Sequence, residues 1–463
     1  MHYLSGGIMT TKEIENAISG ILAKNKDYKR NQAYYNGNNP TITNKPRQEK
    51  PDIRISIPIA KKAIGTVGGY SFREMEYKAM ENDDAGQTMA AQDYQDQLDA
   101  VLQFNESSLE TLELFNECAT QGAAYELHWF GQESELPEFG LIPGRQGMMI
   151  YSRDVKPKPL YFYRTISYTI GDDEVTDFYV YDALSCEVYR REGDKDFKMI
   201  PEESFTHAYG EIPAIEYKID AEGQNLFYHV TDLIDELDRL YSSNIGNELS
   251  KISASLLMTN RYLSELTTLD DHGRSGTQTD EMLDGRKWVL DGIDKQAGDF
   301  FEWLEKNAPA DFVFGSADRI ERLTYDQLEI PNFSDTEKWG NNVSGVAAAY
   351  RLIGFNNLCN HLFSYFSKGL YQRVKLINKM FSQMPGMTSI IPQVKIEPVK
   401  QMPKNILENS TIARNLMGIA PKSDILKLFP TIVEDATESA ALAIIEKEKE
   451  SLALMGGVSE PTL

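Results

Sequence analysis

Cysteine is scarce in this sequence of 463 residues, and its three cysteines, Cys118, Cys186 and Cys359, lie far apart. None forms a CxxC pair, so neither a disulfide framework nor a zinc knuckle is expected. The N-terminus lacks a positively charged segment followed by an apolar run. No apolar run reaches the roughly 20 residues of a membrane span. We therefore expect a protein of a reducing compartment that has no membrane segment.

Motifs of catalysis are also missing. There is no GxxxxGK[ST] phosphate loop, which argues against an ATP-driven motor, and no Gly-x-Ser-x-Gly nucleophile elbow. The six histidines follow no metal-ligand spacing. Acidic pairs occur at Asp83-Asp84, Asp172-Asp173 and Asp270-Asp271, but solvated turns are a commoner setting for such pairs than metal sites. We expect no catalytic residue, no metal site and no cofactor.

Basic residues are outnumbered, since 47 Lys and Arg stand against 70 Asp and Glu and give a net charge of −23. Tight binding to nucleic acid comes from Lys and Arg that displace counterions from phosphates. The composition therefore excludes a protein that wraps DNA with high affinity, although an acidic surface can lie beside DNA without gripping it. Solubility alone is the commonest reason for such acidity.

Helical and strand-like patterns are both present. The length predicts two to four compact units. Helical spacing of apolar residues predicts N-terminal helices over residues 10–35, 58–70, 87–104 and 108–121. Alternating patterns predict five strands, at residues 125–130, 148–151, 161–170, 175–181 and 186–190. These strands indicate an antiparallel sheet, a meander or a small barrel.

Longer helices dominate the second half. Apolar periodicity predicts helices over residues 228–263 and 317–328, and the latter runs into a polar loop at 329–344. A stripe over residues 343–381 predicts a helix about 58 Å long if it is continuous. Taken alone, that stripe fits a core helix of a large helical domain equally well. A strand is expected at 390–399 and helices at 405–417, 423–429 and 432–455.

Short motifs follow one another in a recognisable order. They are Tyr35-Asn36-Gly37, Gly68-Gly69-Tyr70, Gly122-Ala123-Ala124-Tyr125-Glu126-Leu127, Gly210-Glu211-Ile212-Pro213-Ala214-Ile215-Glu216-Tyr217, Asp232-Leu233-Ile234-Asp235, residues 242–247, Pro331-Asn332-Phe333 and Ser344-Gly345-Val346-Ala347. Together they resemble the portal proteins of long-tailed double-stranded DNA phages, of the type found in phages of Gram-positive bacteria. The resemblance covers residues 34–446. Arg73 departs from it, because the family often has Gly after the Tyr-x-Phe that is here Tyr70-Ser71-Phe72.

The resemblance implies an α+β, mainly helical portal fold. Its parts are a wing of helices and an antiparallel β region, a long-helix stem, a small α/β clip and a helical crown. By position, residues 1–227 form the wing, 228–263 and 317–328 the stem helices, 264–316 the clip, 329–344 the tunnel loop, 345–402 the long wing helix with its following strand, and 403–463 the crown and C-terminal tail.

The resemblance also implies a ring of identical subunits, usually about twelve, at one vertex of a virion capsid assembled in the host cytoplasm. Double-stranded DNA would pass through it without sequence recognition during packaging and ejection. The other implied partners are the terminase large subunit, which supplies the ATPase, a head–tail adaptor, and the major capsid and scaffolding proteins. No membrane and no enzymatic activity of the chain itself are implied.

Three groups of site residues follow from this assignment. The tunnel-loop residues expected to face DNA are Pro331, Asn332, Phe333, Lys338, Asn341, Asn342, Val343 and Ser344. Packing between subunits is assigned to Gly345, Ala347, Ala348, Ala349, Ser253 and Ala254. Docking of terminase and adaptor at the clip is assigned to Asp270, Asp271, Arg274, Arg286 and Trp288. Lys338, the only Lys or Arg of the loop, either touches phosphate or pairs with Glu337 or Asp335.

Two other functions remain open from the residues themselves. The first is a structural head or tail subunit that forms a lattice or tube without a DNA channel. The second is a metal-dependent nuclease that uses scattered acidic pairs such as Asp83-Asp84. Microscopy of the purified protein separates the first from a portal, and nuclease assays with Mg²⁺ or Mn²⁺ test the second.

Overall fold

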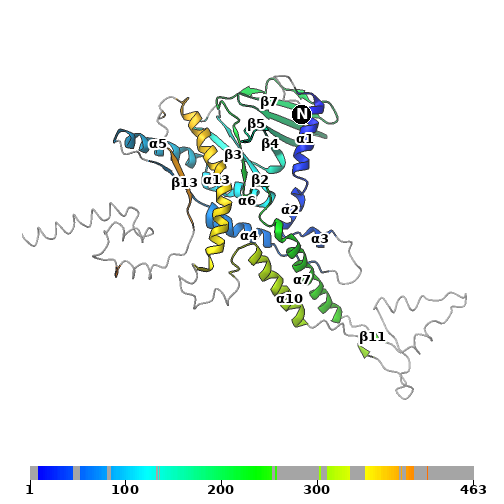
Figure 1. Ribbon diagram of the computed structural model, residues 1–463. Helices are drawn as coiled ribbons and strands as arrows, with labels where there is room; N and C mark the ends of the chain where they lie inside the picture. Colours follow the sequence, from blue (N-terminus) through cyan, green and yellow to red (C-terminus); the bar gives the residue numbers. More distant parts are fainter. Residues whose placement is uncertain are drawn as a thin grey trace, which may run out of the picture. The chain divides into compact units, whose positions relative to one another are not determined.

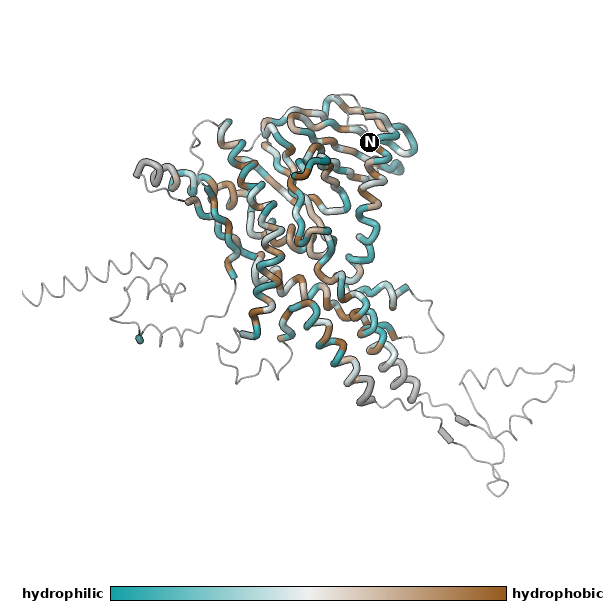
Figure 2. The backbone as a smooth tube through the Cα atoms, in the orientation of Figure 1, coloured by the Kyte–Doolittle hydropathy of each residue, from teal (hydrophilic) through white to brown (hydrophobic). Residues whose placement is uncertain are grey.

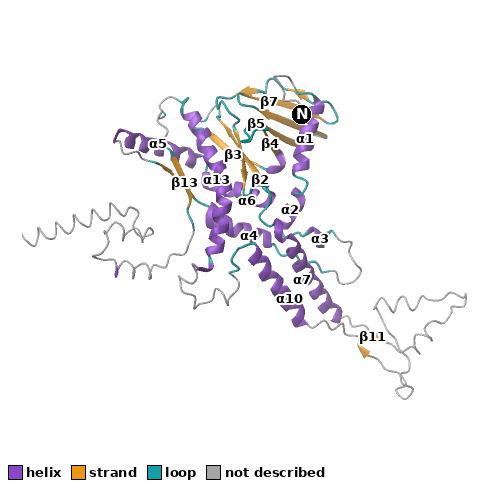
Figure 3. Cartoon of the chain, viewed as in Figure 1, coloured by secondary structure: helices purple, strands orange, loops and turns teal. Residues whose placement is uncertain are grey.

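The computed structural model describes most of the first 400 residues. These are residues 9–44, 53–80, 85–131, 136–252, 310–333, 350–384 and 393–400, with the isolated positions 134, 256–257, 302–303, 387 and 414–415. At residues 85–90, 244–252, 256–257, 302–303 and 310–313 it describes the backbone alone. The chain divides into two compact units, and the first, residues 1–340 and 351–400, holds nearly all described residues. Helices and antiparallel strands are mixed in this unit (Figure 3), which confirms the α+β class.

The N-terminal segment forms two helices, α1 (Thr11–Lys24) and α2 (Tyr28–Tyr35). Thr10 and Glu13 form a capping box at the start of α1. At its end, Asn25 Nδ2 donates a hydrogen bond of 2.7 Å to the carbonyl of Ile21. Because this cap ends α1, the predicted single helix over residues 10–35 is wrong. The short helix α3 (Pro40–Thr43) follows.

Helix α4 (Ile59–Val67) passes directly into a π-helical turn at Gly68–Phe72. Arg73, at the end of this turn, has right-handed backbone angles of φ −72° and ψ −36°. The position that is often Gly in the portal family therefore requires no glycine here, because no left-handed backbone is needed.

The next two helices, α5 (Ala85–Phe104) and α6 (Ser107–Gln121), agree with the predicted ranges to within two residues. α6 ends at Gly122, whose φ is 92°. A Cβ at this glycine would collide with the carbonyl oxygen of Gly223. Glycine is thus required where the chain leaves α6 and enters the first sheet strand.

Four antiparallel sheets are formed by the described residues. The largest has the order β4-β5-β6-β7-β8, with β9 also paired to β7. Its strands are β4 (Gly147–Tyr151), β5 (Pro159–Ile170), β6 (Asp173–Tyr181), β7 (Ser185–Glu192), β8 (Lys198–Met199) and β9 (Phe205–Thr206). A three-stranded sheet has the order β10-β2-β3, formed by β2 (Ala123–Trp129), β3 (Glu138–Ile142) and β10 (Ala214–Lys218). All five predicted strands are confirmed, whereas β3 and β10 were not predicted.

Two small pairings complete the strands. β1 (Met75–Ala79) pairs with β13 (Val394–Pro398). This pairing joins a strand of the N-terminal part to a strand more than 300 residues later in the sequence. β11 (Leu256–Leu257) pairs with β12 (Glu302–Trp303). Residues 256–257 are therefore strand, and the predicted helix over 228–263 is too long at its end.

The sheets and helices are layered (Figure 1). Helix α1 covers one face of the six-stranded sheet, and the other face of that sheet packs on the three-stranded sheet. Along β2 the side chains alternate, since Tyr125 and Leu127 face the six-stranded sheet while Glu126 and His128 face away from it. Helices α6 and α13 (Ile353–Phe381) cover the face of the three-stranded sheet that carries Glu126 and His128. The stripe over 343–381 does not form one continuous helix, because a turn at Leu352 precedes α13.

Helices α7 (Thr231–Ile252) and α10 (Ala310–Gln327) extend from the layered body side by side (Figure 1). The two helices contact each other and run in opposite directions. The strand β11, which follows α7, correspondingly pairs antiparallel with β12, which precedes α10. Figure 2 shows hydrophobic and hydrophilic residues alternating along both helices, as their amphipathic sequences require. α10 starts earlier than the predicted residue 317.

Candidate functional site

The expected channel loop begins at the end of α10, and the structure describes its first five residues. The amide of Glu329 donates to Asp326 O at 3.1 Å, and that of Ile330 to Tyr325 O at 3.1 Å. Glu329 between them is left-handed, with φ 54°. This is the Schellman arrangement that ends helices, here without its usual glycine. It fixes the direction in which the chain leaves α10.

The loop start is anchored on one side and exposed on the other. Ile330 and Tyr325 are buried in the main core, and Lys62 Nζ lies 5.0 Å from the centroid of the Tyr325 ring. Beyond Pro331, the Asn332 amide lies 3.4 Å from Glu321 Oε1 of α10. The Phe333 side chain is 56% exposed. The segment 331–333 therefore carries an uncharged surface at the end of α10.

Most other predicted site residues lie outside the described part of the chain. These are Lys338, Asn341, Asn342, Val343 and Ser344 of the loop, the packing residues Gly345, Ala347, Ala348, Ala349, Ser253 and Ala254, and the docking residues Asp270, Asp271, Arg274, Arg286 and Trp288. Their roles remain predictions. The structure places Pro331, Asn332 and Phe333 at the end of α10, and their role also stays a prediction.

A buried aspartate fixes the base of α7. Asp238 is fully buried and accepts three hydrogen bonds, from Asn39 Nδ2 at 2.8 Å, Ser56 Oγ at 3.1 Å and the Ile57 amide at 2.9 Å. Burial raises the pKa of Asp238, and these three donors oppose that rise. Because all three donors lie in the segment between α2 and α4, they tie α7 to the N-terminal helices.

Three further hydrogen bonds hold the same helix. Tyr34 OH donates to Asp235 Oδ1 at 2.6 Å, and Ser242 Oγ contacts both the amide and the carbonyl of Ile55. Since α10 packs along α7, these anchors also position α10 and the loop start that follows it. The two helices therefore form an antiparallel pair that is anchored to the N-terminal helices and that leads into the segment 331–333.

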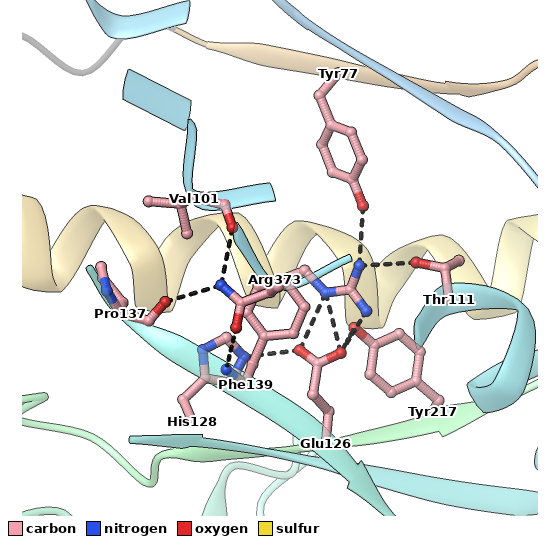
Figure 4. Close-up of polar contacts among 10 residues, drawn as sticks. Tyr77, Val101, Thr111, Glu126, His128, Pro137, Phe139, Tyr217 and Arg373 are labelled. Atoms are coloured by element: carbon pink, nitrogen blue, oxygen red, sulfur yellow. Dashed lines mark hydrogen bonds and ion pairs between the residues drawn. The ribbon is translucent and has the colours of Figure 1, made fainter. Parts of the chain in front are cut away.

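Helix α13 is fixed to the three-stranded sheet by a fully buried ion pair (Figure 4). Arg373 Nε lies 3.1 Å and 3.0 Å from the two carboxylate oxygens of Glu126, and Nη2 also donates to Oε2. Arg373 Nη1 donates to Thr111 Oγ1 at 2.8 Å and to Tyr77 OH at 3.2 Å. The pair joins α13 to β2, α6 and β1 at one point.

Aromatic rings and a glycine complete the surroundings of this pair. The Arg373 guanidinium lies 4.6 Å from the Phe139 ring centroid. Tyr217 OH donates to Glu126 Oε2 at 3.2 Å, and His128 Nε2 lies 2.7 Å from Oε1. Although burial opposes it, the Arg373 charge and the His128 bond hold the pKa of Glu126 at about 2. The carboxylate is therefore charged at neutral pH.

Gly369, one helical turn before Arg373, makes this contact possible. A Cβ at Gly369 would lie 2.8 Å from Cζ of the buried Tyr217 ring and closer still to Cε1 and Cδ1. The absence of a side chain lets α13 approach β10 closely enough for Arg373 to reach Glu126. Sequence reasoning missed this cluster. The available signal was Arg373 beside the apolar positions Leu370 and Val374 of the stripe, where a cation needs a buried partner.

Metal-binding clusters and membrane spans were sought among the described residues. Within them, no group of three or more His, Cys, Asp or Glu side chains is arranged to hold a metal ion. Asp172 and Asp173 lie exposed at the turn between β5 and β6. Among the described helices, none is both long and apolar enough to cross a membrane.

Comparison with known proteins shows a family and a likeness to solved structures. The family described as phage portal protein, SPP1 Gp6-like, matches residues 16–452. Among solved structures, the chain is similar to a chain from the neck of a native GTA particle computed with C12 symmetry. That similarity covers 87% of this chain and 93% of the other, at 11% identity and a TM-score of 0.37. No curated protein matches the chain.

Proposed function

The chain belongs to the SPP1 Gp6-like family of phage portal proteins, and we propose that it forms a closed ring of identical subunits around a channel for double-stranded DNA. The ring would stand at one vertex of the capsid, where DNA enters during packaging and leaves during ejection. Family membership supports a structural role, and the chain itself would perform no catalysis. A separate terminase large subunit would supply the ATPase.

One observation carries the channel assignment, namely the anchored helix pair α7 and α10 with an uncharged exposed segment at its end. A channel has to let a polyanion slide, and each neutralised phosphate adds salt-dependent affinity that would resist sliding. Pro331, Asn332 and Phe333 supply no charge, and Lys338 is the only cation of residues 329–344. We assign this loop to the inner wall of the ring, where it would touch DNA without reading its sequence.

The remaining segments take their roles from the family resemblance. Residues 1–227 would be the wing, 228–263 and 317–328 the stem, 264–316 the clip that docks terminase and later a head–tail adaptor, 345–402 the long wing helix with its strand, and 403–463 the crown and tail. Major capsid and scaffolding proteins would surround the wing during assembly. In this arrangement the stem helices carry the tunnel loop at their inner end.

Deletion of residues 332–342 tests the assignment of the loop. The variant is expected to form the same rings as the wild-type chain while packaging no DNA. The helix hairpin ends before the deletion, and Tyr325 and Ile330 keep their core contacts. Circular dichroism and an unchanged melting temperature of the variant serve as the control for general damage. If the loop deletion prevents ring formation, the loop is a structural joint and the channel assignment is wrong.

A further inference from the structure

Acidic and basic residues are strongly segregated along this chain. Residues 79–144 contain 14 Asp and Glu but no Lys or Arg. Residues 339–396 contain six Lys and Arg but no Asp or Glu. In a chain with 70 Asp and Glu, 58 consecutive residues without a carboxylate are unusual. Helix α13 lies in the basic stretch and helix α5 in the acidic one.

The exposed face of α13 carries a line of lysines. Lys368, Lys375 and Lys379 are spaced by seven and four residues, so they lie on one face of the helix, away from the buried Arg373. Lys375 pairs with Glu211, and Lys368 Nζ lies 4.9 Å from the Tyr365 ring centroid. Within the described residues, neither Lys368 nor Lys379 forms an ion pair. Two exposed cations of α13 are therefore available to a partner.

The outer surface of α5 is the acidic counterpart. Asp93, Asp96 and Asp99 are exposed and spaced by three residues. The opposite side of α5 faces the core, where Tyr94 OH donates to Asn378 of α13 at 2.8 Å. Asp96 and Asp99 accept bonds only from Gln92 and Gln95 of the same helix in the described part of the chain. Lys78 of β1 lines the same pocket as Asp99, but among the described residues this aspartate row forms no ion pair.

We propose that the lysine face of α13 in one subunit docks on the aspartate row of α5 in the next. The inference rests on the proposed ring, because a ring needs a head-to-tail contact between two different surfaces of the same chain. The two faces have opposite charge, and among the described residues they form no ion pair with each other inside one chain. Charge complementarity of this kind selects the partner and its register.

Phosphates of DNA are the other polyanion that the lysine face would suit. The observations favour a second copy for two reasons. The net charge of −23 repels DNA from the surface as a whole. In addition, binding of DNA to α13 would leave the aspartates of α5 without a partner, whereas one contact between copies accounts for both faces.

A charge swap tests the proposal. The first variant carries Lys368→Glu and Lys379→Glu, and the second carries Asp93→Lys and Asp96→Lys. Each variant alone places like charges across the contact. The protein concentration at which half of the chains are assembled, measured by mass photometry, should therefore rise about tenfold or more above that of the wild-type chain. An equimolar mixture should assemble again, because each variant offers the face that complements the other. Rings that alternate the two variants satisfy every contact.

The outcomes separate this inference from the proposed function. Wild-type chain that stays monomeric contradicts the ring itself. Wild-type rings with unchanged assembly of both variants overturn the α5–α13 contact and leave the ring intact. Variants that assemble normally, with Lys368→Glu/Lys379→Glu alone losing salt-dependent DNA binding, would assign the lysine face to DNA and overturn the proposal. Circular dichroism and unchanged melting temperatures show that the exposed substitutions leave the fold intact.

Discussion

Arg373 of α13 and Glu126 of β2 form an ion pair in which neither side chain has any exposure to solvent, although 247 residues separate them in the chain. Three of the guanidinium contacts go to the carboxylate, and the others reach Thr111 and Tyr77. The pair fixes α13, the long helix that follows the expected channel loop in the sequence, to the three-stranded sheet.

Breaking this pair should destabilise the protein strongly. Arg373→Met leaves the Glu126 charge buried without its partner, so we expect a loss of about 3–5 kcal/mol in the free energy of unfolding. Replacing both residues, with Glu126→Leu and Arg373→Met, should cost less than the single change. Lys12→Met at an exposed position of α1 is the control and should stay within about 0.5 kcal/mol. Chemical denaturation measures all three, and a double variant as unstable as Arg373→Met would contradict this reading.

Close approach of α13 to β10 predicts a contrast between two glycines of one helix. Gly369→Ala places a methyl group against the buried Tyr217 ring, which is held by its bond to Glu126, and should cost about 1–3 kcal/mol. Gly354→Ala meets no atom within 4 Å and should be neutral or stabilise by up to about 1 kcal/mol. Thermal unfolding compares the two. Equal effects would show that the contact at Gly369 does not limit the packing of α13.

Glu110 of α6 lies near the same cluster and should make stability depend on pH. Burial raises its pKa to about 7, and the charge of Glu126 adds to the rise. A carboxyl group with a raised folded pKa stabilises the folded state below its unfolded pKa of about 4.3, and that contribution disappears as pH rises toward 7. Glu110→Gln should therefore stabilise the protein at pH 8 by roughly 1–2 kcal/mol, since the group is partly exposed, and have little effect at pH 4.5. Melting temperatures that shift equally at both pH values would refute the assignment.

The left-handed residue at the end of α10 gives a prediction for the loop. Glu329 has φ 54° and places a carboxylate near a helix C-terminus, and both features are unfavourable. Glu329→Gly should raise the free energy of unfolding by roughly 0.5–1 kcal/mol. Glu329→Ala serves as the control, because it removes the charge but keeps the Cβ, and should gain less. If Glu329→Ala raises the free energy of unfolding as much as Glu329→Gly, the carboxylate charge and not the left-handed backbone angle is what destabilises the wild-type protein.

Strong periodic patterns made part of this fold predictable from the sequence. The alternation in β5, β6 and β7 and the apolar spacing in α5 and α6 located these elements to within a few residues. β1 and β10 were missed because each has five residues that mix Lys and Glu with apolar side chains, and only their pairing with distant strands makes them strands.

The site was predictable to a smaller extent. Pro331, Asn332 and Phe333 follow a helix that the pattern located, and their role in a channel stays a prediction. The ion pair between Arg373 and Glu126 was not predictable. A helical pattern locates Arg373 on α13 and an alternating pattern locates Glu126 on β2, but neither pattern says which distant residues come into contact. The break at Leu352 was also missed, since the apolar period continues across it.

The proposal of a DNA channel is tested most directly by cryo-electron microscopy of the purified full chain. We expect closed rings with a central hole wide enough for a DNA duplex, with residues 329–344 lining the hole and α13 behind them. Tubes, sheets or monomers would contradict the ring. Rings that carry Pro331 to Phe333 on their outer surface would contradict the assignment of this segment to the channel.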